Sequence, residues 1–386
     1  MKHLIYPNEL IAKVAVIFSF FPFITPVYNG MDSQPYSLIF VLVSFFLFSK
    51  DSIPYPTLFL ISVLYFLIAI SMFVFDALIY EFSFEFVRNV ANYLSLCILP
   101  FYYIMYIRKY SFPKGIFIFS SLLYFFAAIV QQVLEPEIFN FLVHSRTTET
   151  RGVTSLTPEP THYGFVCFIF LMIVQFSGCF SKKEKIILNF FFVLQILFLA
   201  KSSMTVLFLM LFYFYYFIIR DLSLNKFLFA ITFVIVFNFS IEFLEGSRVY
   251  EIYNNFIDVG YLIFKYDASM NDRLSHIYLS LYGFFNNGFL PNFQSEFYYL
   301  TENKFNLSDG FFWYGLPGTK IMSYIGSIVF QTGFLGVLYL ILLFYYMGSS
   351  HRTFLIFVMI PILFSAIPLS LPLIPFLFAI MLTENN

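Results

Sequence analysis

The sequence has few charged residues. Of its 386 residues only 11% are Asp, Glu, Lys or Arg, whereas 60% are hydrophobic. A water-soluble domain has about 25% charged residues, so this chain has too few to cover a surface that faces water. The deficit excludes an ordinary soluble protein and indicates a lipid bilayer as the surroundings. The net charge of −1 also argues against nucleic-acid binding, which requires a basic face.

Residues that bind metals or form cross-links are scarce as well. The chain has only three cysteines and five histidines. Cys97, Cys167 and Cys179 lie in or beside apolar runs without CxxC spacing, which is typical of small buried apolar side chains. Carboxylates do not cluster with metal-binding spacing either. We therefore expect no disulfide, no metal site and no cofactor.

Long apolar runs make up most of the chain. A membrane-spanning helix needs about 20 mostly apolar residues. The runs predict an all-α, polytopic membrane protein, a single membrane domain over residues 1–386 with about twelve transmembrane helices. Ten or eleven is the alternative, if the last pair of runs forms a re-entrant hairpin. The runs cover residues 10–27, 36–49, 56–75, 89–107, 114–133, 162–180, 186–200, 203–219, 227–241, 320–346, 353–367 and 369–382.

Basic residues at the ends of these runs orient the chain. In the twelve-span arrangement one side collects Lys2, Lys13, Lys50, the segments 108–114, 181–185 and 220–226, and Arg352. Lys and Arg in short loops mark the cytoplasmic side. Two long hydrophilic loops, approximately 134–161 and 242–319, are then predicted to face outward, and the larger one is expected to contain short amphipathic helices.

Arginine departs from this charge rule. Nine of the 13 lysines fall on the cytoplasmic side, but five of the eight arginines fall outside, namely Arg88, Arg146, Arg151, Arg248 and Arg273. A guanidinium binds phosphate through two parallel N–H donors, whereas an ammonium is a point charge without this fixed geometry. Outward arginines therefore indicate a diphosphate site, and we favour this function for Arg151 and Arg273. In the alternative they anchor loops to headgroups or pair with the acids of the second loop.

The segment RGVTSLTPEPTHYG, residues 151–164, places charged and rigid residues between two apolar runs. Its two prolines fix the backbone at the mouth of the sixth span. Thr161 is expected to cap the helix that begins at His162. Glu159 either caps the same helix or accepts the proton of an attacking sugar hydroxyl.

The segment NDRLSHIYLSLYGFF, residues 271–285, has apolar residues at helical spacing. It predicts a short amphipathic helix lying on the bilayer surface, capped by Asn271 or Asp272. Arg273 and His276 are three residues apart and share one face of this helix. Arg273 suits a diphosphate at headgroup depth, and His276 is a second candidate for proton transfer.

Lys201 interrupts two neighbouring apolar runs at their outer end. An ammonium group beside the hydrocarbon of the bilayer is unfavourable in free energy unless it faces protein or water. It either joins the anion site or extends to the interface.

Together these segments resemble the O-antigen and capsular polysaccharide polymerases (Wzy-type), which are relatives of the O-antigen ligases. The resemblance covers roughly residues 85–345. It is carried by RGVTSLTPEPTHYG, by AKSSMTVLF at 200–208, by NDRLSHIYLSLYGFF with NNGFLPNF at 286–293, and by SYIGSIVFQTGFLGVLYL at 323–340.

The resemblance implies a metal-independent, inverting glycosyltransferase in the bacterial cytoplasmic membrane, with its active site facing the exterior. Such an enzyme transfers a growing glycan from polyprenyl diphosphate to a lipid-linked repeat unit, alongside a chain-length regulator and a flippase. The resemblance points to Arg151 and Arg273 as catalytic ligands of the diphosphate, and the reading of residues 151–164 adds Glu159 as the candidate catalytic base. Further candidates for substrate binding are Arg146, His162, Lys201, His276 and Tyr324. The ligases keep a histidine where this chain has Ser323-Tyr324, which favours a polymerase.

Three other functions are weighed against a polymerase: an O-antigen ligase, a lipid-linked oligosaccharide flippase or other transporter, and a membrane scaffold. Transporters usually carry ionisable residues near the bilayer centre. Here Asp76, Lys201 and Lys320 lie only near span ends. A scaffold does not need outward arginines.

Overall fold

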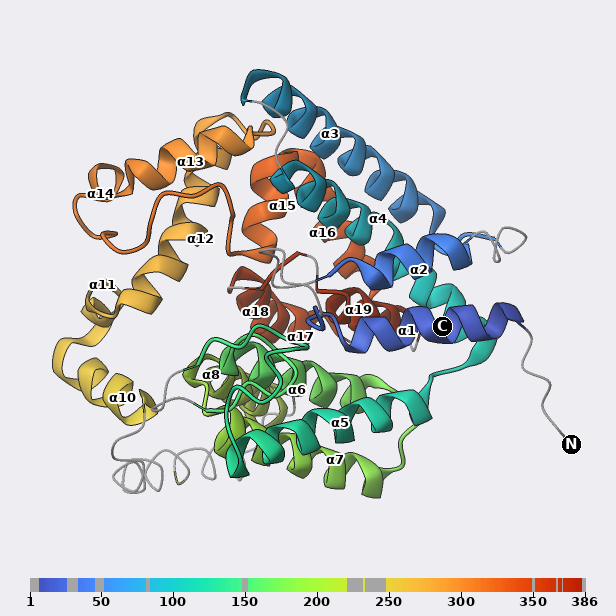
Figure 1. Ribbon diagram of the computed structural model, residues 1–386. Coiled ribbons are helices and arrows are strands. Elements are labelled where there is room, and N and C mark those ends of the chain that lie inside the picture. The colour runs from blue at the N-terminus through green and yellow to red at the C-terminus, as the bar shows by residue number, and fades with distance from the viewer. Residues whose placement is uncertain are drawn as a thin grey trace, which may run out of the picture. The chain divides into compact units, whose positions relative to one another are not determined.

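The computed structural model describes residues 7–25, 34–45, 52–80, 84–147, 152–220, 232, 248–348, 351–365, 367–369 and 371–383. Over these residues the chain forms helices and connecting loops, so the predicted all-α class is confirmed (Figure 1). The chain divides into two compact units. Unit 1 contains residues 1–54, 98–230 and 370–386, and unit 2 contains residues 55–97 and 231–369. Helix α4 (Phe84–Tyr110) contributes its first part to unit 2 and the rest to unit 1.

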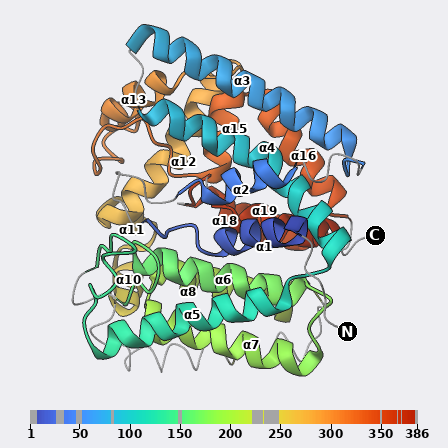
Figure 2. The same cartoon turned by 45° about the vertical axis from the view of Figure 1, so that its right-hand side comes forward.

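Unit 1 is built around α6 (Pro160–Phe176), in which every side chain from Phe165 to Val174 is buried. Helix α6 packs against α7, α8 and α19, and Figure 2 shows α5, α6 and α7 running alongside one another. The other helices of unit 1 are α1 (Pro7–Phe20), α2 (Tyr36–Phe45), α5 (Lys114–Val133), α7 (Lys182–Leu194), the π-helix η2 (Gln195–Ala200), α8 (Ser203–Phe214), the π-helix η3 (Tyr215–Ile219) and α19 (Leu373–Thr383).

The expected interruption at Lys201 is present. Helix α7 continues through η2 to Ala200, where the helical hydrogen bonding stops. Lys201 then adopts the left-handed conformation with φ of 48°, and α8 begins at Ser203. The predicted spans 186–200 and 203–219 correspond to the helices on the two sides of this break.

Unit 2 has a core in which Leu279, Phe297, Ile321 and Phe330 are buried together. Here α3 packs against α13, α15 and α16, and α12 packs against α15. The helices of unit 2 are α3 (Pro56–Tyr80), α10 (Arg248–Val259), η5 (Gly260–Leu262), α11 (Ile263–Tyr266), α12 (Ala268–Asn286), α13 (Gln294–Glu302), α14 (Lys304–Leu307), α15 (Tyr324–Thr332), α16 (Phe334–Tyr346), α17 (Arg352–Phe354), η7 (Leu355–Met359) and α18 (Ile360–Phe364).

The predicted span 320–346 is wrong as a single helix. It consists of α15 and α16, separated at Gly333, which has a φ of 60°. A Cβ at Gly333 would lie 2.6 Å from the carbonyl oxygen of Phe289, and this oxygen accepts a hydrogen bond from the Phe334 amide at 2.9 Å. The turn around Phe289 therefore packs into the break between the two helices. The predicted span 227–241 lies outside the described residues.

Three helices in the described part of the chain are long and apolar enough to cross a membrane. They are Pro56–Ile79, Phe86–Tyr110 and Lys114–Val133, which correspond to predicted spans. In the first of these, only 28% of the most apolar 18-residue window is buried by protein. The uncovered apolar surface requires lipid in place of water, so the chain is a membrane protein. Shorter apolar helices lie at other predicted spans.

Candidate functional site

Two of the segments that the sequence singled out meet in unit 1. The Val153 amide donates a hydrogen bond to the carbonyl oxygen of Leu199 at 2.9 Å. A Cβ on Gly152 would lie 2.2 Å from the carbonyl oxygen of Ala200. Only glycine allows so close an approach, because any side chain would overlap the backbone of η2. The segment that begins with Gly152 is thus packed directly against the residues that precede Lys201.

Gln131 of α5 holds the same segment in place. Its side-chain amide donates to Thr154 Oγ1 at 3.0 Å and to the Ser155 carbonyl at 3.3 Å, while its oxygen accepts from the Ser155 amide at 2.5 Å. The Ser155 hydroxyl in turn donates to the Tyr124 carbonyl at 2.6 Å. All four residues are buried. A fully hydrogen-bonded buried network of this kind rigidifies the backbone that leads to Glu159.

Helix α6 begins at Pro160 with Glu159 at the N-cap position, so the predictions of a start at His162 and a Thr161 cap are wrong. The Glu159 side chain makes no capping hydrogen bond. Its carboxylate lies instead between two basic groups, 3.4 Å from Arg146 Nη2 and 3.9 Å from His162 Nδ1. The side chains of Glu159 and Arg146 are 29% and 48% exposed, so a ligand can reach both.

This cluster of Glu159, Arg146 and His162, here called the α6 mouth, brings together three residues predicted from the sequence. The Arg146 backbone is tied to the segment by its amide, which donates to the Pro158 carbonyl at 2.6 Å. The His162 ring packs edge-on against Phe23, with 5.3 Å between ring centroids. A carboxylate held this way can accept a proton, and a guanidinium has donors for a phosphate oxygen as well.

Two other predicted cations belong to unit 1. Lys201 is exposed and directly follows Ala200, whose carbonyl contacts Gly152. Arg151 lies outside the described residues, although Gly152 beside it is fixed against η2. Lys201 is therefore an exposed residue next to the point where Gly152 packs against η2.

In unit 2 the predicted residue His276 faces protein with both ring nitrogens. Nδ1 accepts a hydrogen bond from the Met322 amide at 3.3 Å, and Nε2 lies 3.8 Å from Asp272 Oδ1. Burial, together with the positive charges of Lys304 and Lys320, lowers the pKa of His276 from 6.5 to about 4. The ring is neutral at physiological pH and holds α12 against the chain before α15, which favours a structural role.

The other predictions for unit 2 have mixed outcomes. Arg273 is half-buried on α12, next to Asp272. The predicted caps of this helix, Asn271 or Asp272, are wrong, because Asp267 accepts the Met270 amide at 2.9 Å. Tyr324 is buried in the protein interior at the start of α15, which favours packing over ligand contact.

The sequence did not single out Lys304, which is buried beside α12. Its ammonium group donates hydrogen bonds to the carbonyls of Tyr314 and Gly315. Burial lowers the pKa of Lys304, and Asp272 opposes this shift. Burial also raises the pKa of Asp272, against the positive charges of Lys304 and Arg273. Lys304 and Asp272 are 32 positions apart, so no local spacing could have revealed that they influence each other.

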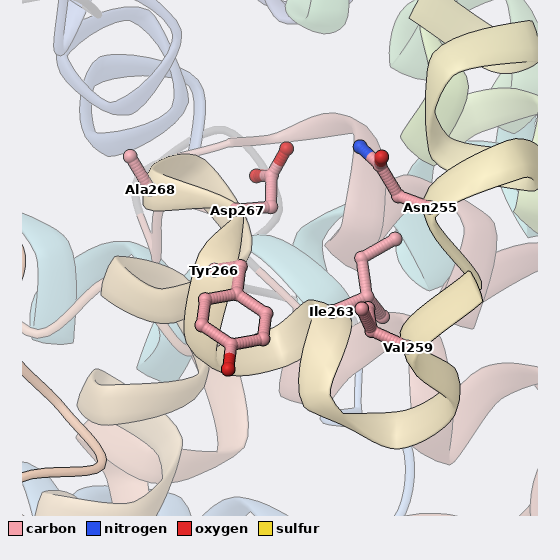
Figure 3. Close-up of a pocket in the computed structure, with 6 residues that line it drawn as sticks. All are labelled: Asn255, Val259, Ile263, Tyr266, Asp267 and Ala268. Carbon is pink, nitrogen blue, oxygen red and sulfur yellow. The ribbon is translucent and has the colours of Figure 1, made fainter.

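Unit 2 also contains a cavity of about 430 Å³ where α10, α11 and the start of α12 meet (Figure 3). It is lined by Asn255, Val259, Ile263, Tyr266, Asp267 and Ala268. None of the residues predicted for the site lines it. Over the described ranges, no three His, Cys, Asp or Glu side chains gather in a way that could hold a metal ion.

The four segments that carry the family resemblance form two contacting pairs, one in each unit. In unit 1, residues 152–164 contact the end of η2 before α8. In unit 2, α12 packs on α15, where a Cβ on Gly283 would meet the Phe330 ring at 2.3 Å, and the Asn292 amide donates to the Phe330 carbonyl at 2.9 Å.

Compared with known proteins, the chain matches no family model, no curated protein and no solved structure.

Proposed function

We propose that the chain is a membrane glycosyltransferase. It polymerises polyprenyl-diphosphate-linked oligosaccharide repeat units into a surface polysaccharide, O-antigen or capsule, on the outer face of the bacterial cytoplasmic membrane. The observation that carries the proposal is the position of Glu159. Glu159 makes no capping hydrogen bond, and its carboxylate faces Arg146 and His162 and stays accessible.

The reaction requires what the α6 mouth offers. An acceptor hydroxyl attacks the anomeric carbon of the donor, a new glycosidic bond forms, and the bond from that carbon to the diphosphate breaks. The hydroxyl proton passes to Glu159, and the bonding electrons leave with the lipid diphosphate. Because diphosphate is already a good leaving group, catalysis needs a base, orientation and positive charge. Arg146 and Lys201 provide such charge in unit 1, and Arg151 adds to it in the proposal.

The proposal includes the twelve-span topology, with the site facing outward and Arg273 as a predicted diphosphate ligand. Contacts within the units support the predicted sides of the membrane. On the predicted outer side, the Thr25 amide donates to the Leu142 carbonyl at 2.6 Å in unit 1. On the predicted cytoplasmic side, Lys114 pairs with Glu184 at 2.7 Å. In each case two segments that the topology assigns to one side are in contact.

The test is polymerisation by the purified protein in lipid vesicles supplied with a lipid-linked repeat unit. Glu159→Gln keeps the size of the side chain but cannot accept the proton, so we expect polymer formation to fall by about 100-fold or more. Glu184→Gln is the matched control, because Glu184 is also an ion-paired glutamate at a helix start in unit 1. Glycan of normal length and rate from Glu159→Gln would remove Glu159 as the base.

A deletion strain separates the candidate functions. A single repeat unit on the cell surface or its carrier indicates a polymerase. Complete loss of surface repeat units indicates a flippase or a ligase and would contradict the proposal.

A further inference from the structure

Unit 2 exposes a set of large apolar side chains on α10, α11 and the segment 311–316. We call this set the aromatic surface. Its members are Phe256, Ile257, Tyr261, Phe264, Tyr266, Trp313, Tyr314 and Leu316. Leu316 is 89% exposed, Tyr261 71% and Ile257 62%. Single exposed apolar residues are common, but so many near one another mark a binding surface.

Buried hydrogen bonds hold the two parts of the aromatic surface together. The amide group of Asn271, which is fully buried, donates to the Phe264 carbonyl at 3.1 Å and to the Phe311 carbonyl at 2.9 Å. Its oxygen accepts from the backbone amides of Trp313 and Tyr314 at 3.0 and 3.1 Å. The surface is therefore constructed by the fold and is not a collection of independent loop residues.

Trp313 is the only tryptophan in the chain, and its indole N–H forms a hydrogen bond within the protein. The Trp313 indole N–H donates to the Lys265 carbonyl at 2.7 Å, while the side chain remains 48% exposed. What Trp313 offers to its surroundings is mainly the apolar part of the ring. The cavity of Figure 3 adjoins the same surface through Tyr266.

Helix α12, which the sequence places on the bilayer surface, is partly covered by protein. Helix α12 buries Asn271, His276, Leu279 and Phe284, and it packs against α11, α13 and α15. Of the apolar stripe predicted to face the bilayer, Phe284 is buried, whereas Phe285 is 60% exposed, so the position of α12 on the bilayer surface stays a prediction. The neighbouring α10 and α11 expose more large apolar side chains than α12 does.

The part of unit 2 that carries the aromatic surface is attached to the end of a candidate membrane span. Asp76 lies near the end of α3, and its carboxylate accepts the Gln294 amide at 2.6 Å and the Ser295 hydroxyl at 2.7 Å. It thereby caps α13, which follows α12 after a short connection. This attachment keeps the helices of the larger loop close to the level at which α3 leaves the bilayer.

We propose that the aromatic surface rests in the interfacial layer of the bilayer, where it contacts lipid headgroups and the first part of the acyl chains. Trp and Tyr are enriched in this layer, and the Tyr side chains of this surface combine an apolar ring with a polar hydroxyl. Phe256, Ile257 and Leu316 favour lipid over a glycan, because they offer no hydrogen bonds to sugar hydroxyls. The proposal depends on the chain being a membrane protein and does not depend on the glycosyltransferase function.

The single tryptophan makes the full-length, unmodified protein its own reporter. The protein is placed in bilayers of ordinary phosphatidylcholine or of phosphatidylcholines brominated at different depths, and Trp313 is excited where tyrosine does not absorb. We expect brominated lipid to remove most of the emission, with bromines near the headgroup more effective than bromines near the chain ends. Aqueous iodide should quench weakly. Trp313→Phe confirms that the emission arises from this residue.

Three results would overturn the proposal. Equal emission in brominated and ordinary lipid, with strong quenching by iodide, would show that Trp313 faces water. Quenching that is strongest with bromines near the chain ends would place the surface in the hydrocarbon core. Emission that responds to soluble oligosaccharide and not to brominated lipid would make the surface a glycan site. In Leu316→Glu the charge should push the surface out of the lipid and increase quenching by iodide.

Discussion

The position of a Cβ on Gly152 is 2.2 Å from the carbonyl oxygen of Ala200, so the segment leading to Glu159 touches the break before α8 with no room for a side chain. The hydrogen bond from Val153 to Leu199 lies next to this contact. Two stretches nearly fifty residues apart in sequence are thereby fixed to each other, and the α6 mouth depends on that attachment.

Gly152→Ala should separate these stretches, because the obstacle is backbone and cannot rotate away. We expect a loss of about 3 kcal/mol in stability, seen as a lower thermal midpoint in detergent, together with reduced polymer formation. Gly115→Ala on α5 is the matched control, since nothing lies within 4 Å of its Cβ position. That variant should be neutral or up to about 1 kcal/mol more stable. Equal midpoints for the two variants would contradict the close packing at Gly152.

Asp76 should stabilise α13 from outside that helix. Asp76→Ala removes both acceptors of the first turn of α13, and we expect a loss of about 1–2 kcal/mol, the usual cost of a lost N-cap. Asp76→Asn keeps one acceptor, so its stability should lie between that of Asp76→Ala and that of the wild type. Limited proteolysis of the larger loop and the thermal midpoint measure the effect. Glu302→Gln, at the exposed far end of α13, is the control and should change neither.

Lys304→Met should be strongly destabilising. It leaves the carbonyls of Tyr314 and Gly315 without their donor and Asp272 without a neighbouring ammonium. A hydrogen bond from a charged donor contributes about 1.5–3 kcal/mol, and we expect a loss of about this size. Adding Asp272→Asn should recover part of this loss, because the uncompensated carboxylate disappears. Trp313 emission during thermal unfolding reports the change. No recovery in the double variant would show that the two side chains are not coupled.

The stability of unit 2 should depend on pH through His276. Its pKa falls from 6.5 to about 4 on folding, so between these values the unfolded chain binds more protons. The contribution of His276 to the free energy of unfolding is then fully present above about pH 6.5. It decreases by up to about 3 kcal/mol as the pH falls toward 4. The raised pKa of Asp272 acts with the opposite sign at the acid end, so stability should change most steeply in the upper half of this pH window, below pH 6.5.

Thermal midpoints measured across this pH range test the dependence on His276. His276→Gln, which keeps an acceptor for the Met322 amide, should flatten the curve. An unchanged slope in that variant would assign the dependence to other groups.

Local sequence patterns located several elements well. The apolar runs predicted the helices on both sides of Lys201, because chain length and apolar composition decide whether a segment can be a buried helix. They failed at 320–346, since the break at Gly333 depends on the turn around Phe289 from elsewhere in the chain. The periodicity of α12 predicted a helix correctly, but periodicity by itself does not tell lipid from protein as the material that covers an apolar face.

The residues of the candidate site, too, were predicted only in part by local sequence patterns. Proline and charge patterns were enough to select Glu159, Arg146 and His162, but they left capping and proton transfer as alternatives for Glu159. Lys304 gave no signal, because its partners are distant in sequence.

The amino-acid sequence by itself determined that this is an all-α membrane protein and where its polar residues interrupt the apolar helices, because both follow from composition and from neighbours within a few turns. Only the tertiary structure decided that Glu159 pairs with Arg146 instead of capping α6, and that α10 and α11 expose the aromatic surface. Hydrogen bonding and burial there depend on residues such as Gln131, Leu199 and Asn271, whose approach no local spacing encodes.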